Sequence, residues 1–274
     1  MIFLLHLGTF MYKTFKKLTA LLGALAALSA CHSAVQPAKT VFLAGATGVI
    51  GEPLGKALVA KGYHVYGTTR SAEKAKQLEA DGITPVVLDI YDAAAVEKAV
   101  VNAKPDVVIS QLSSLPKGLK EEEMAEGLKR DNRIRIAGTR NLIAATEKAG
   151  TPKFITQSFV FYAESATPPI EESALLSTKD PVYGESTAAM MNLEKQTLAG
   201  KFTPVVLRYG WIYGGKSGFN APIEGYSTIH IDAVVDATVR AVEADLKGIY
   251  NVSEASPFIN IDKFRKAVPG WKDK

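Results

Sequence analysis

Three glycines near residue 50 are spaced so that they could bind a phosphate-bearing ligand. Gly45, Gly48 and Gly51 occupy every third position of the run GATGVIG. An apolar run at 41–44 precedes them and an amphipathic stretch at 52–61 follows, which predicts a strand, a turn and a helix. Glycine permits the tight turn and the close approach of the backbone to a pyrophosphate, and the helix N-terminus supplies free N–H groups. The pattern predicts dinucleotide binding; the alternative is a simple turn.

The next predicted strand ends in residues that would meet the ribose of such a ligand. This strand spans 64–68 and lies about twenty residues beyond the glycines, as a dinucleotide fold requires. NAD-binding chains usually place an acid here to hold the ribose 2′-hydroxyl, but between residue 64 and Glu73 the sequence contains no acid. Arg70, with the hydroxyls of Thr69 and Ser71, suits a 2′-phosphate instead, so we expect NADP(H) to be favoured over NAD(H). The alternative is that Arg70 is a solvated residue at a helix start.

These residues need a rigid framework, and the rest of the chain predicts one. We expect strands at 41–44, 64–68, 85–88, 107–110, 154–156 and 205–208, with helices at 52–61, 72–81, 93–102 and 133–149. This alternation is typical of an α/β protein of Rossmann type, with a doubly wound parallel sheet covered on both faces. Residues 40–274 would form this domain, with a small C-terminal substrate-binding portion and substrate loops mainly in 159–186 and 210–228.

Further short motifs recur along the chain after the glycine run. They are LD at 88–89, PDVVIS at 105–110, GTRNL at 138–142, FITQS at 154–158, LRYG at 207–210, IHID at 229–232 and GIYNV at 248–252. With GATGVIG they resemble the short-chain dehydrogenase/reductase superfamily, and more closely its extended or atypical branch, the NAD(P)-dependent epimerase/dehydratase family. The likeness extends from residue 40 to residue 271.

The resemblance implies a role for each matching position. The implied cofactor residues are Gly45, Thr47, Gly48, Val49, Ile50 and Gly51 for the pyrophosphate, Arg70 for the adenosine ribose, Asp89 and Ile90 for the adenine, and Ser110, Gln111 and Leu112 for the ribose on the nicotinamide side. Ser158 matches the family's hydroxyl residue at the end of the fifth strand. That residue usually donates a hydrogen bond to the substrate oxygen.

The chain departs from the family at its catalytic pair. Family enzymes use Tyr-x-x-x-Lys, in which helical spacing puts both side chains on one face and the lysine lowers the pKa of the tyrosine. Here the pattern meets Tyr183 followed by Thr187, or in a shifted register Ser186 followed by Met190. Tyr183 is the candidate proton donor, although a phenol without a lysine is a poor base at pH 7. Tyr162 is an alternative donor.

The first forty residues predict a targeting segment. Three lysines between residues 13 and 17 precede an apolar run at 18–30, and LSAC at 28–31 resembles the lipobox of bacterial lipoproteins. We expect a signal peptide at 1–31, a polar tether at 32–39, a lipid anchor on Cys31 and a periplasm-facing, membrane-anchored protein. Residues 1–10 fit an upstream extension before a start at Met11. The alternative is a buried helix in a cytoplasmic protein.

Composition narrows the classes of function. The net charge of the 274 residues is +4, but Lys13, Lys16 and Lys17 precede the first acidic residue, so the remainder carries 4 − 3 = +1. This nearly neutral body gives no electrostatic reason to expect nucleic-acid binding. One cysteine and four scattered histidines exclude a cysteine-rich metal site, and we expect no metal and a small-molecule substrate.

Aromatic residues gather in the loop after the last predicted strand: Trp211, Tyr213, Phe219 and Tyr226. They would stack on a planar or sugar ligand, or else close a small core. The leading hypothesis is an NADP(H)-dependent oxidoreductase for a small carbonyl or sugar-derived substrate, with Ser158 polarising the oxygen and Tyr183 transferring the proton. The alternatives are a non-catalytic NADP(H)-binding or sensor protein, and a nucleotide-sugar epimerase or dehydratase.

Overall fold

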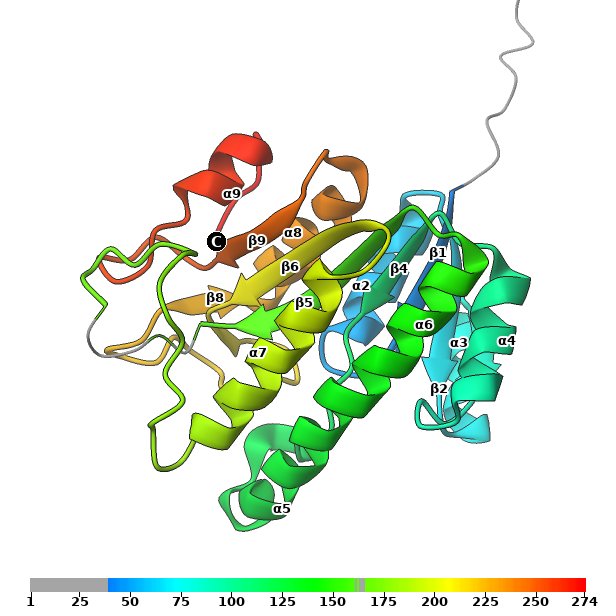
Figure 1. Cartoon of the computed structure of the whole chain (residues 1–274), viewed down its shortest axis with the longest axis horizontal. Coiled ribbons are helices and arrows are strands. Elements are labelled where there is room, and N and C mark those ends of the chain that lie inside the picture. Colours follow the sequence, from blue (N-terminus) through cyan, green and yellow to red (C-terminus); the bar gives the residue numbers. More distant parts are fainter. Residues whose placement is uncertain (1–38, 161, 163–165) are drawn as a thin grey trace, which may run out of the picture. The chain divides into compact units, whose positions relative to one another are not determined.

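A seven-stranded parallel sheet forms the centre of the protein (Figure 1). The computed structural model describes residues 39–160, 162 and 166–274. The strands are β1 (Thr40–Ala44), β2 (His64–Thr69), β3 (Thr84–Val87), β4 (Val107–Ser110), β5 (Lys153–Phe159), β6 (Thr203–Tyr209) and β9 (Gly248–Val252), in the order β3-β2-β1-β4-β5-β6-β9. The predicted α/β Rossmann architecture is confirmed, and the seventh strand, β9, coincides with the GIYNV motif, which the resemblance matched to a late strand.

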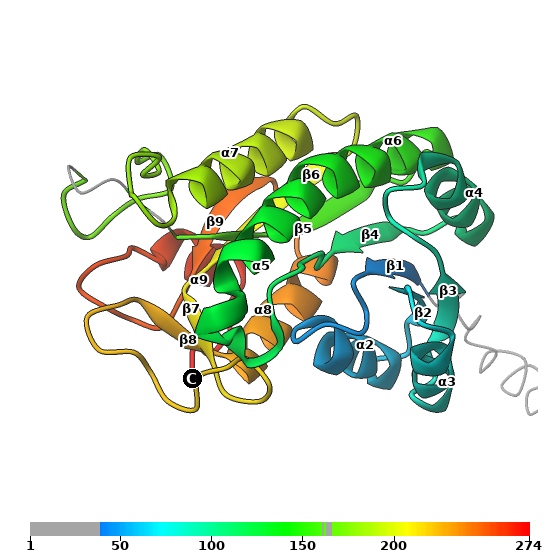
Figure 2. The same cartoon turned by 90° about the horizontal axis from the view of Figure 1, so that it is seen from below.

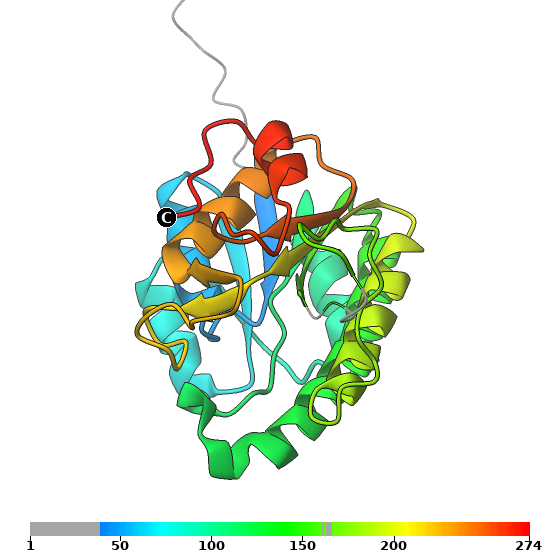
Figure 3. The same cartoon turned by 90° about the vertical axis from the view of Figure 1, so that its left-hand side faces the viewer.

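Helices cover both faces of the sheet (Figure 2). One face carries α2 (Gly51–Ala60), α3 (Ala72–Ala80) and α8 (Ile231–Glu243), and the other carries α4 (Ala93–Ala103), α6 (Thr139–Ala149) and α7 (Gly184–Leu198). Figure 3 shows α8, in orange, and α7, in yellow-green, on opposite sides of the strands. Because both faces are covered, residues 41–44 of β1 are all fully buried, and the strand has no polar alternation.

The segment between β4 and α6 differs from the single helix expected at 133–149. A short 3-10 turn, η1 (Lys117–Leu119), leads into α5 (Glu121–Arg133), and a π-helical turn, η2 (Ile134–Gly138), joins α5 to α6. Acidic residues begin α5 and basic residues end it, as the helix dipole favours. Because α5 is polar along most of its length, the apolar pattern of the sequence begins only at residue 133.

The order in which the chain adds strands to the sheet reverses between β1 and β4. From β1 the chain proceeds to β2 and β3 on one side, whereas β4, β5, β6 and β9 extend on the other. Ala44 at the end of β1 pairs with Ser110 at the end of β4, and the Gln111 N–H donates to the Ala44 carbonyl over 2.9 Å. Ligands of open α/β sheets bind outside the carboxyl ends of the strands at such a reversal. The glycine run starts there, at residue 45.

The C-terminal part adds a small second sheet to this edge. It consists of β7 (Trp211–Tyr213) and β8 (Thr228–His230), which are parallel, and a final helix, α9 (Asp262–Ala267), packs near β9. The sequence predicts loop throughout 210–228, but β7 forms because Trp211 pairs with Thr228. The substrate loops therefore have a short β-ladder of their own.

The predictions of a signal peptide, a tether and a lipid anchor concern residues that lie outside the part of the chain that the structure describes. The signal peptide and the tether up to residue 38, including Cys31, precede the described range, which begins at Lys39. Residues 39–274 form one compact unit. Within the described part of the chain, none of the helices has the length and apolar character needed to cross a membrane.

Candidate functional site

The glycine run folds into a tight turn that has no room for a Cβ atom at Gly45 or Gly51. Gly45 has a φ of +83°, and a Cβ on it would lie 2.5 Å from the carbonyl oxygen of Gln111. A Cβ on Gly51 would lie 2.0 Å from the carbonyl oxygen of Gly45. The Gly45 N–H donates to Thr68 Oγ1 over 2.9 Å, which ties the loop to the end of β2. Glycine is therefore required at both positions, because a Cβ at either one would clash with a backbone carbonyl group.

The N-terminus of α2 faces this turn. The helix begins at Gly51, and no side chain among the described residues caps it. Gly48 and Val49 are exposed and Thr47 is half-buried, whereas Ile50 is buried beneath the loop. An uncapped helix N-terminus beside exposed glycine backbone fits a diphosphate, because the positive end of the helix dipole lies next to the turn. Within the first turn the Glu52 N–H donates to the Gly48 carbonyl over 3.0 Å and Pro53 has no N–H, so the N–H groups for a ligand would come from the glycine turn itself. The predicted pyrophosphate residues thus lie in one loop whose shape fits the cofactor.

The residues expected at the adenosine end lie where β2 and β3 end side by side. Arg70 follows β2 and is exposed, and Asp89 follows β3 and is exposed as well. Ile90 is buried, and Asn141 of α6 donates to its carbonyl oxygen over 3.0 Å. The sequence did not single out Asn141 for a role, although it lies in the GTRNL motif. Arg70, Asp89 and Ile90 share the edge of the sheet that carries the glycine loop.

The segment after β4 follows the same edge. Ser110, Gln111 and Leu112 are all buried. Gln157, near the end of β5, donates to the Leu112 carbonyl over 2.9 Å and fixes the path of the segment. The Gln111 amide lies near the Tyr209 hydroxyl, but among the described residues neither of its polar atoms has a partner in good hydrogen-bond geometry. Buried polar groups are normally well paired, so this amide also fits a site that a polar ligand completes.

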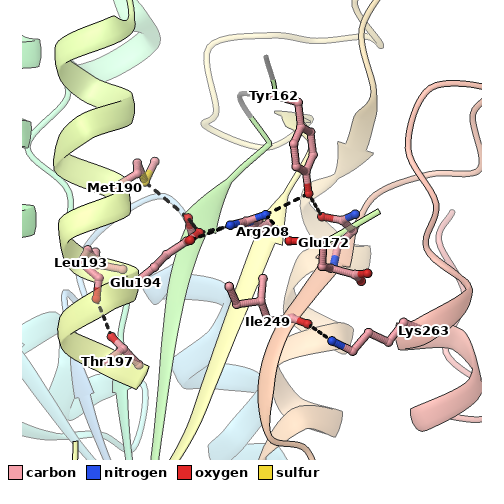
Figure 4. Close-up of polar contacts among 11 residues, drawn as sticks. Tyr162, Glu172, Met190, Leu193, Glu194, Thr197, Arg208, Ile249 and Lys263 are labelled. Atoms are coloured by element: carbon pink, nitrogen blue, oxygen red, sulfur yellow. Dashed lines mark hydrogen bonds and ion pairs between the residues drawn. The ribbon is translucent and has the colours of Figure 1, made fainter. Parts of the chain in front are cut away.

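Ser158 lies inside a buried ionic network rather than on an open surface, and Figure 4 shows Glu194, Arg208 and Tyr162 of this network. It is 2% exposed, and its hydroxyl donates to Glu194 Oε1 over 2.6 Å. Glu194, on α7, receives two further hydrogen bonds from Arg208 of β6, each 2.7 Å long. A serine hydroxyl can donate one hydrogen bond, and here Glu194 accepts that bond. In this arrangement Ser158 cannot also donate to a substrate oxygen, which argues against the polarising role implied by the resemblance.

The same network continues to the neighbouring strand. Arg208 Nη1 donates to the Tyr162 hydroxyl over 3.1 Å, and Tyr162 donates to the Asn251 side chain on β9. Burial opposes the charge of Arg208, but the hydrogen bonds and charge of Glu194 outweigh it and raise the pKa of Arg208. Burial also raises the pKa of Tyr162, against the effect of Arg208. Tyr162, the alternative proton donor, is therefore held in a protonated, paired state.

The expected catalytic pair has no lysine in either register. Thr187 is fully buried, and its hydroxyl donates to the Tyr183 carbonyl over 3.0 Å, one turn back on α7. In the shifted register Ser186 and Met190 are both 3% exposed. The sulfur of Met190 lies 3.7 Å from Ser158 Oγ. Tightly packed small and apolar side chains thus occupy the positions where the family has its charged group.

Tyr183 instead joins an aromatic cluster that we call the Trp211 cluster. Its rings are Phe159, Tyr183, Phe219 and Tyr226, which surround Trp211 at centroid distances of 5.3, 6.0, 6.3 and 5.3 Å. Phe159 ends β5 and Trp211 begins β7, so the cluster lies at the carboxyl edge of the sheet. The sequence does not mark Phe159, because a phenylalanine at a strand end is normally core. The fold places these separated segments together.

Two other aromatic or histidine residues of this region have structural partners. The Tyr213 hydroxyl donates to Glu254 over 2.6 Å, and burial with the nearby Glu254 carboxylate raises the pKa of Tyr213 to about 12. The His230 ring packs on Tyr213 at 5.1 Å between centroids. Tyr213 thus has its partners in Glu254 and His230 rather than in the Trp211 cluster, contrary to its grouping with the other loop aromatics.

The loop between β7 and β8 extends to the helix that follows the glycine turn. Lys216 forms an ion pair with Glu52, in the first turn of α2, with a shortest distance of 2.8 Å. The Lys216 ammonium holds the pKa of the Glu52 carboxyl below its usual value. At Gly218 a Cβ would meet the backbone of Gly118, in η1, at 3.1 Å. The predicted substrate loop at 210–228 therefore contacts elements on both sides of the switch point.

The described residues include no group of three or more histidine, cysteine, aspartate or glutamate side chains arranged to hold a metal ion. This edge of the sheet carries the open glycine turn at the start of α2 and the rings of the Trp211 cluster. The geometry at the glycine loop accordingly fits a dinucleotide.

Residues 45–245 match the family model described as NAD(P)H-binding. The chain belongs to this family. A curated relative, the 3-diazoavenalumate denitrifying reductase of a Streptomyces species, is 35% identical over 238 residues, with 79% of this chain and 76% of the relative covered. The prediction of an NAD(P)-binding Rossmann protein is thereby confirmed.

Solved structures of low sequence identity share the fold. The UDP-glucose 4-epimerase of Thermotoga maritima, with UDP-glucose, is 19% identical with a TM-score of 0.68, covering 86% of this chain and 94% of that one. The UDP-glucose 4-epimerase of Thermus thermophilus, in complex with NAD, is 20% identical with a TM-score of 0.66 over the same shares. An epimerase of Methanothermobacter thermautotrophicus is 15% identical with a TM-score of 0.70, covering 86% and 88%. At these identities the likeness concerns the fold alone.

Proposed function

We propose that this protein is an NADP(H)-dependent reductase that reduces a planar, electron-poor substrate without a tyrosine–lysine proton relay. The observation that carries the proposal is the buried Thr187, which stands four residues after Tyr183 and is bonded to the Tyr183 carbonyl. No cation can enter this position without disrupting the packing of α7. A reaction at this site should therefore be one that needs no proton from the family's catalytic pair.

The cofactor side of the proposal rests on the glycine loop and on Arg70. The exposed turn at Gly48 and the uncapped start of α2 would bind the diphosphate, and Arg70 would bind the 2′-phosphate. Bound dihydronicotinamide would supply a hydride to the substrate. The buried segment after β4 would position the ribose next to it, because Gln157 holds that segment through the Leu112 carbonyl.

The substrate side rests on the Trp211 cluster. Its rings meet largely edge to face, and Tyr226, at 55% exposure, presents the part of the cluster that a flat molecule can reach. Aromatic pairs are worth about 0.5–1.5 kcal/mol each beyond the burial of area. Such a surface favours an aromatic or conjugated substrate over a sugar, whose hydroxyls need polar partners.

The name of the curated relative indicates a reaction of this type. A diazonium carbon that accepts a hydride forms a C–H bond as its C–N bond breaks, and the electron pair of that bond leaves with N₂. One hydride and one cationic diazonium group give a neutral C–H product and neutral N₂, so no proton is consumed. A carbonyl, by contrast, takes a proton on its oxygen. We therefore propose a planar diazo compound that reacts as its diazonium ion; "diazo" and "denitrifying" are the words in the relative's name.

The two alternatives have weaker support. A nucleotide-sugar epimerase, the class named in the titles of the similar structures, removes a hydroxyl proton from its substrate and relies on a basic group for that step. Ser158 and Tyr162, two of the candidate hydroxyls, donate their hydrogen bonds within a buried network, and Tyr183 has no lysine at the family's position. A non-catalytic cofactor-binding protein would need no aromatic surface at the carboxyl edge of the sheet.

The test is the fate of the cofactor hydride. NADPH deuterated at C4 would be mixed with the protein and a panel of aryl diazonium salts, conjugated carbonyls and nucleotide sugars. We expect N₂ release with deuterium on the product carbon, and little turnover of carbonyls. Tight NADPH binding without turnover of any panel member would contradict the proposal and favour the non-catalytic alternative. Conversion of a nucleotide sugar would favour the epimerase.

We also propose that the mature protein is anchored to a membrane through a lipid on Cys31. The support is the lone cysteine at the end of LSAC, after an apolar run with a basic start. The full-length protein and a Cys31→Ser variant would be expressed in bacteria with labelled palmitate. Labelling of the wild type in the membrane fraction and loss of label in the variant are expected. A soluble wild type that retains residues 11–30 would contradict the proposal.

A further inference from the structure

A stacked arginine and tyrosine face the adenosine end of the site. Tyr91 follows Ile90 after β3, and Arg133 is the last residue of α5. The guanidinium carbon of Arg133 lies 4.4 Å from the centroid of the Tyr91 ring, within the range of a cation–π contact. Nothing in the sequence pattern links the two residues, because they are 42 positions apart and belong to different elements.

The position of Tyr91 is fixed by the backbone around it. Its N–H donates to Asp89 Oδ1 over 3.0 Å, and its carbonyl accepts a hydrogen bond from Asn141 at 3.3 Å. Asn141 also holds the carbonyl of Ile90, so α6 anchors the whole segment after β3. The ring of Tyr91 is therefore a rigid base on which Arg133 rests.

Arg70 belongs to the same neighbourhood. It follows the end of β2, which pairs with β3 so that the Leu88 N–H donates to the Thr69 carbonyl over 3.0 Å. Burial raises the pKa of Tyr91, and the positive charges of Arg133 and Arg70 both act against that rise. Arg133 thus stacks on the ring, the exposed Arg70 follows the neighbouring strand β2, and Asp89 is a carboxylate of the same segment as Tyr91.

We propose that Arg133, held on Tyr91, is a second cation for the 2′-phosphate of NADP(H), acting together with Arg70. A phosphate monoester carries nearly two negative charges at neutral pH. One arginine leaves such a group undercompensated, whereas two guanidinium groups match it. Stacking on Tyr91 limits the rotamers of Arg133, so less entropy is lost when the phosphate binds. The inference rests on the proposed use of NADP(H), and it adds a specificity residue from α5.

The test is equilibrium binding, which does not depend on turnover. The full-length protein and three variants, Arg133→Gln, Arg70→Gln and Arg130→Gln, would be titrated with NADPH, NADH and adenosine 2′,5′-bisphosphate. Arg130 is the matched control, because it is an exposed arginine of the same helix. We expect Arg133→Gln to weaken NADPH and the bisphosphate about fivefold, with NADH changed less than about twofold and Arg130→Gln without effect.

A second variant separates stacking from charge. Tyr91→Ala removes the base under Arg133, and it should weaken the bisphosphate by about as much as Arg133→Gln, whereas Tyr91→Phe retains the ring and should bind as the wild type does. If Arg133→Gln weakens NADPH and NADH equally, or neither, the inference is wrong. If the wild type binds NADH as tightly as NADPH and Arg70→Gln changes nothing, the proposed cofactor preference itself fails, and the inference fails with it.

Discussion

The hydroxyl of Ser158 donates to Glu194 Oε1 over 2.6 Å, and this contact removes the serine from the reactive surface. The serine lies at the end of β5 and the glutamate on α7, so the bond joins the sheet to the helix that would have carried a catalytic lysine. Both groups are nearly inaccessible to solvent. The serine is thus a positioning residue for α7, and the aromatic surface of the Trp211 cluster lies beyond it.

The buried ion pair of Glu194 with Arg208 should dominate the stability of this edge. We expect Glu194→Gln to lower the free energy of unfolding by about 3–5 kcal/mol, because it leaves the buried Arg208 charge without its partner. Replacing both residues with leucine and methionine should recover much of that loss. Urea denaturation measures both effects. The exposed pair of Lys129 with Glu126 is the control, and Glu126→Gln should cause no measurable change. A small effect of Glu194→Gln would show that the pair is solvated.

The glycine loop should respond to added methyl groups in a graded way. Gly51→Ala places a Cβ 2.0 Å from the Gly45 carbonyl oxygen, and Gly48→Ala places one at 3.2 Å. We therefore expect Gly51→Ala to abolish detectable NADPH binding and to lower the melting temperature, and Gly48→Ala to weaken binding with a smaller loss of stability. Gly62→Ala, at an open positive-φ turn, is the control for backbone strain alone. Equal affinities of all three variants would contradict this account of the loop.

Kinetic measurements on two variants can distinguish the contribution of the Trp211 cluster from that of the Tyr183 hydroxyl. Trp211→Ala removes the central ring and should raise KM about tenfold with a smaller change in kcat, since stacking acts on the bound substrate. Tyr183→Phe keeps the ring and should leave kcat and its pH profile within about twofold, because no lysine prepares the phenol for proton transfer. A fall in kcat of about a hundredfold for Tyr183→Phe would restore it as the catalytic acid.

Alkaline pH should destabilise the protein through a buried tyrosine. Burial raises the pKa of Tyr209 to about 12, and its hydroxyl is bonded to Thr238 at 2.7 Å. Thr238 already donates to the Val234 carbonyl, so Tyr209 is the donor in that bond. The unfolded chain loses the tyrosine proton near pH 10 and the folded protein only near pH 12, so this stabilisation is complete below pH 10 and disappears between those values.

The size of this effect follows from the same shift. A two-unit change is worth about 2–3 kcal/mol, so urea unfolding at about pH 9 and about pH 11.5 should differ by a corresponding part of that amount. Tyr209→Phe should reduce the difference, whereas Tyr226→Phe, at an exposed position, should not. An unchanged difference in Tyr209→Phe would assign the alkaline loss to other groups.

The amino-acid sequence determined the cofactor edge of this protein. Glycine spacing, flanked by a buried strand and a helix, depends on local backbone geometry, so the roles of Gly45 and Gly51 follow from the sequence alone. The alternation of strands and helices likewise determined the α/β class. The preference for NADP(H), inferred from Arg70, and the lipid anchor at Cys31 stay predictions. The sequence pattern indicates only the acidic start of the polar helix α5 at 121–123, because the rest of this helix contains few apolar residues.

Only the tertiary structure decided what the remaining polar and aromatic residues do. Ser158 and Glu194 are 36 positions apart, and nothing in the sequence around either residue shows that Glu194 accepts a hydrogen bond from Ser158. The contacts among Phe159, Tyr183 and Trp211, and the stack of Arg133 on Tyr91, depend on which elements the parallel sheet places side by side. Hydrogen bonds and ring contacts act over a few ångströms in space, whereas sequence patterns report only spacing along the chain.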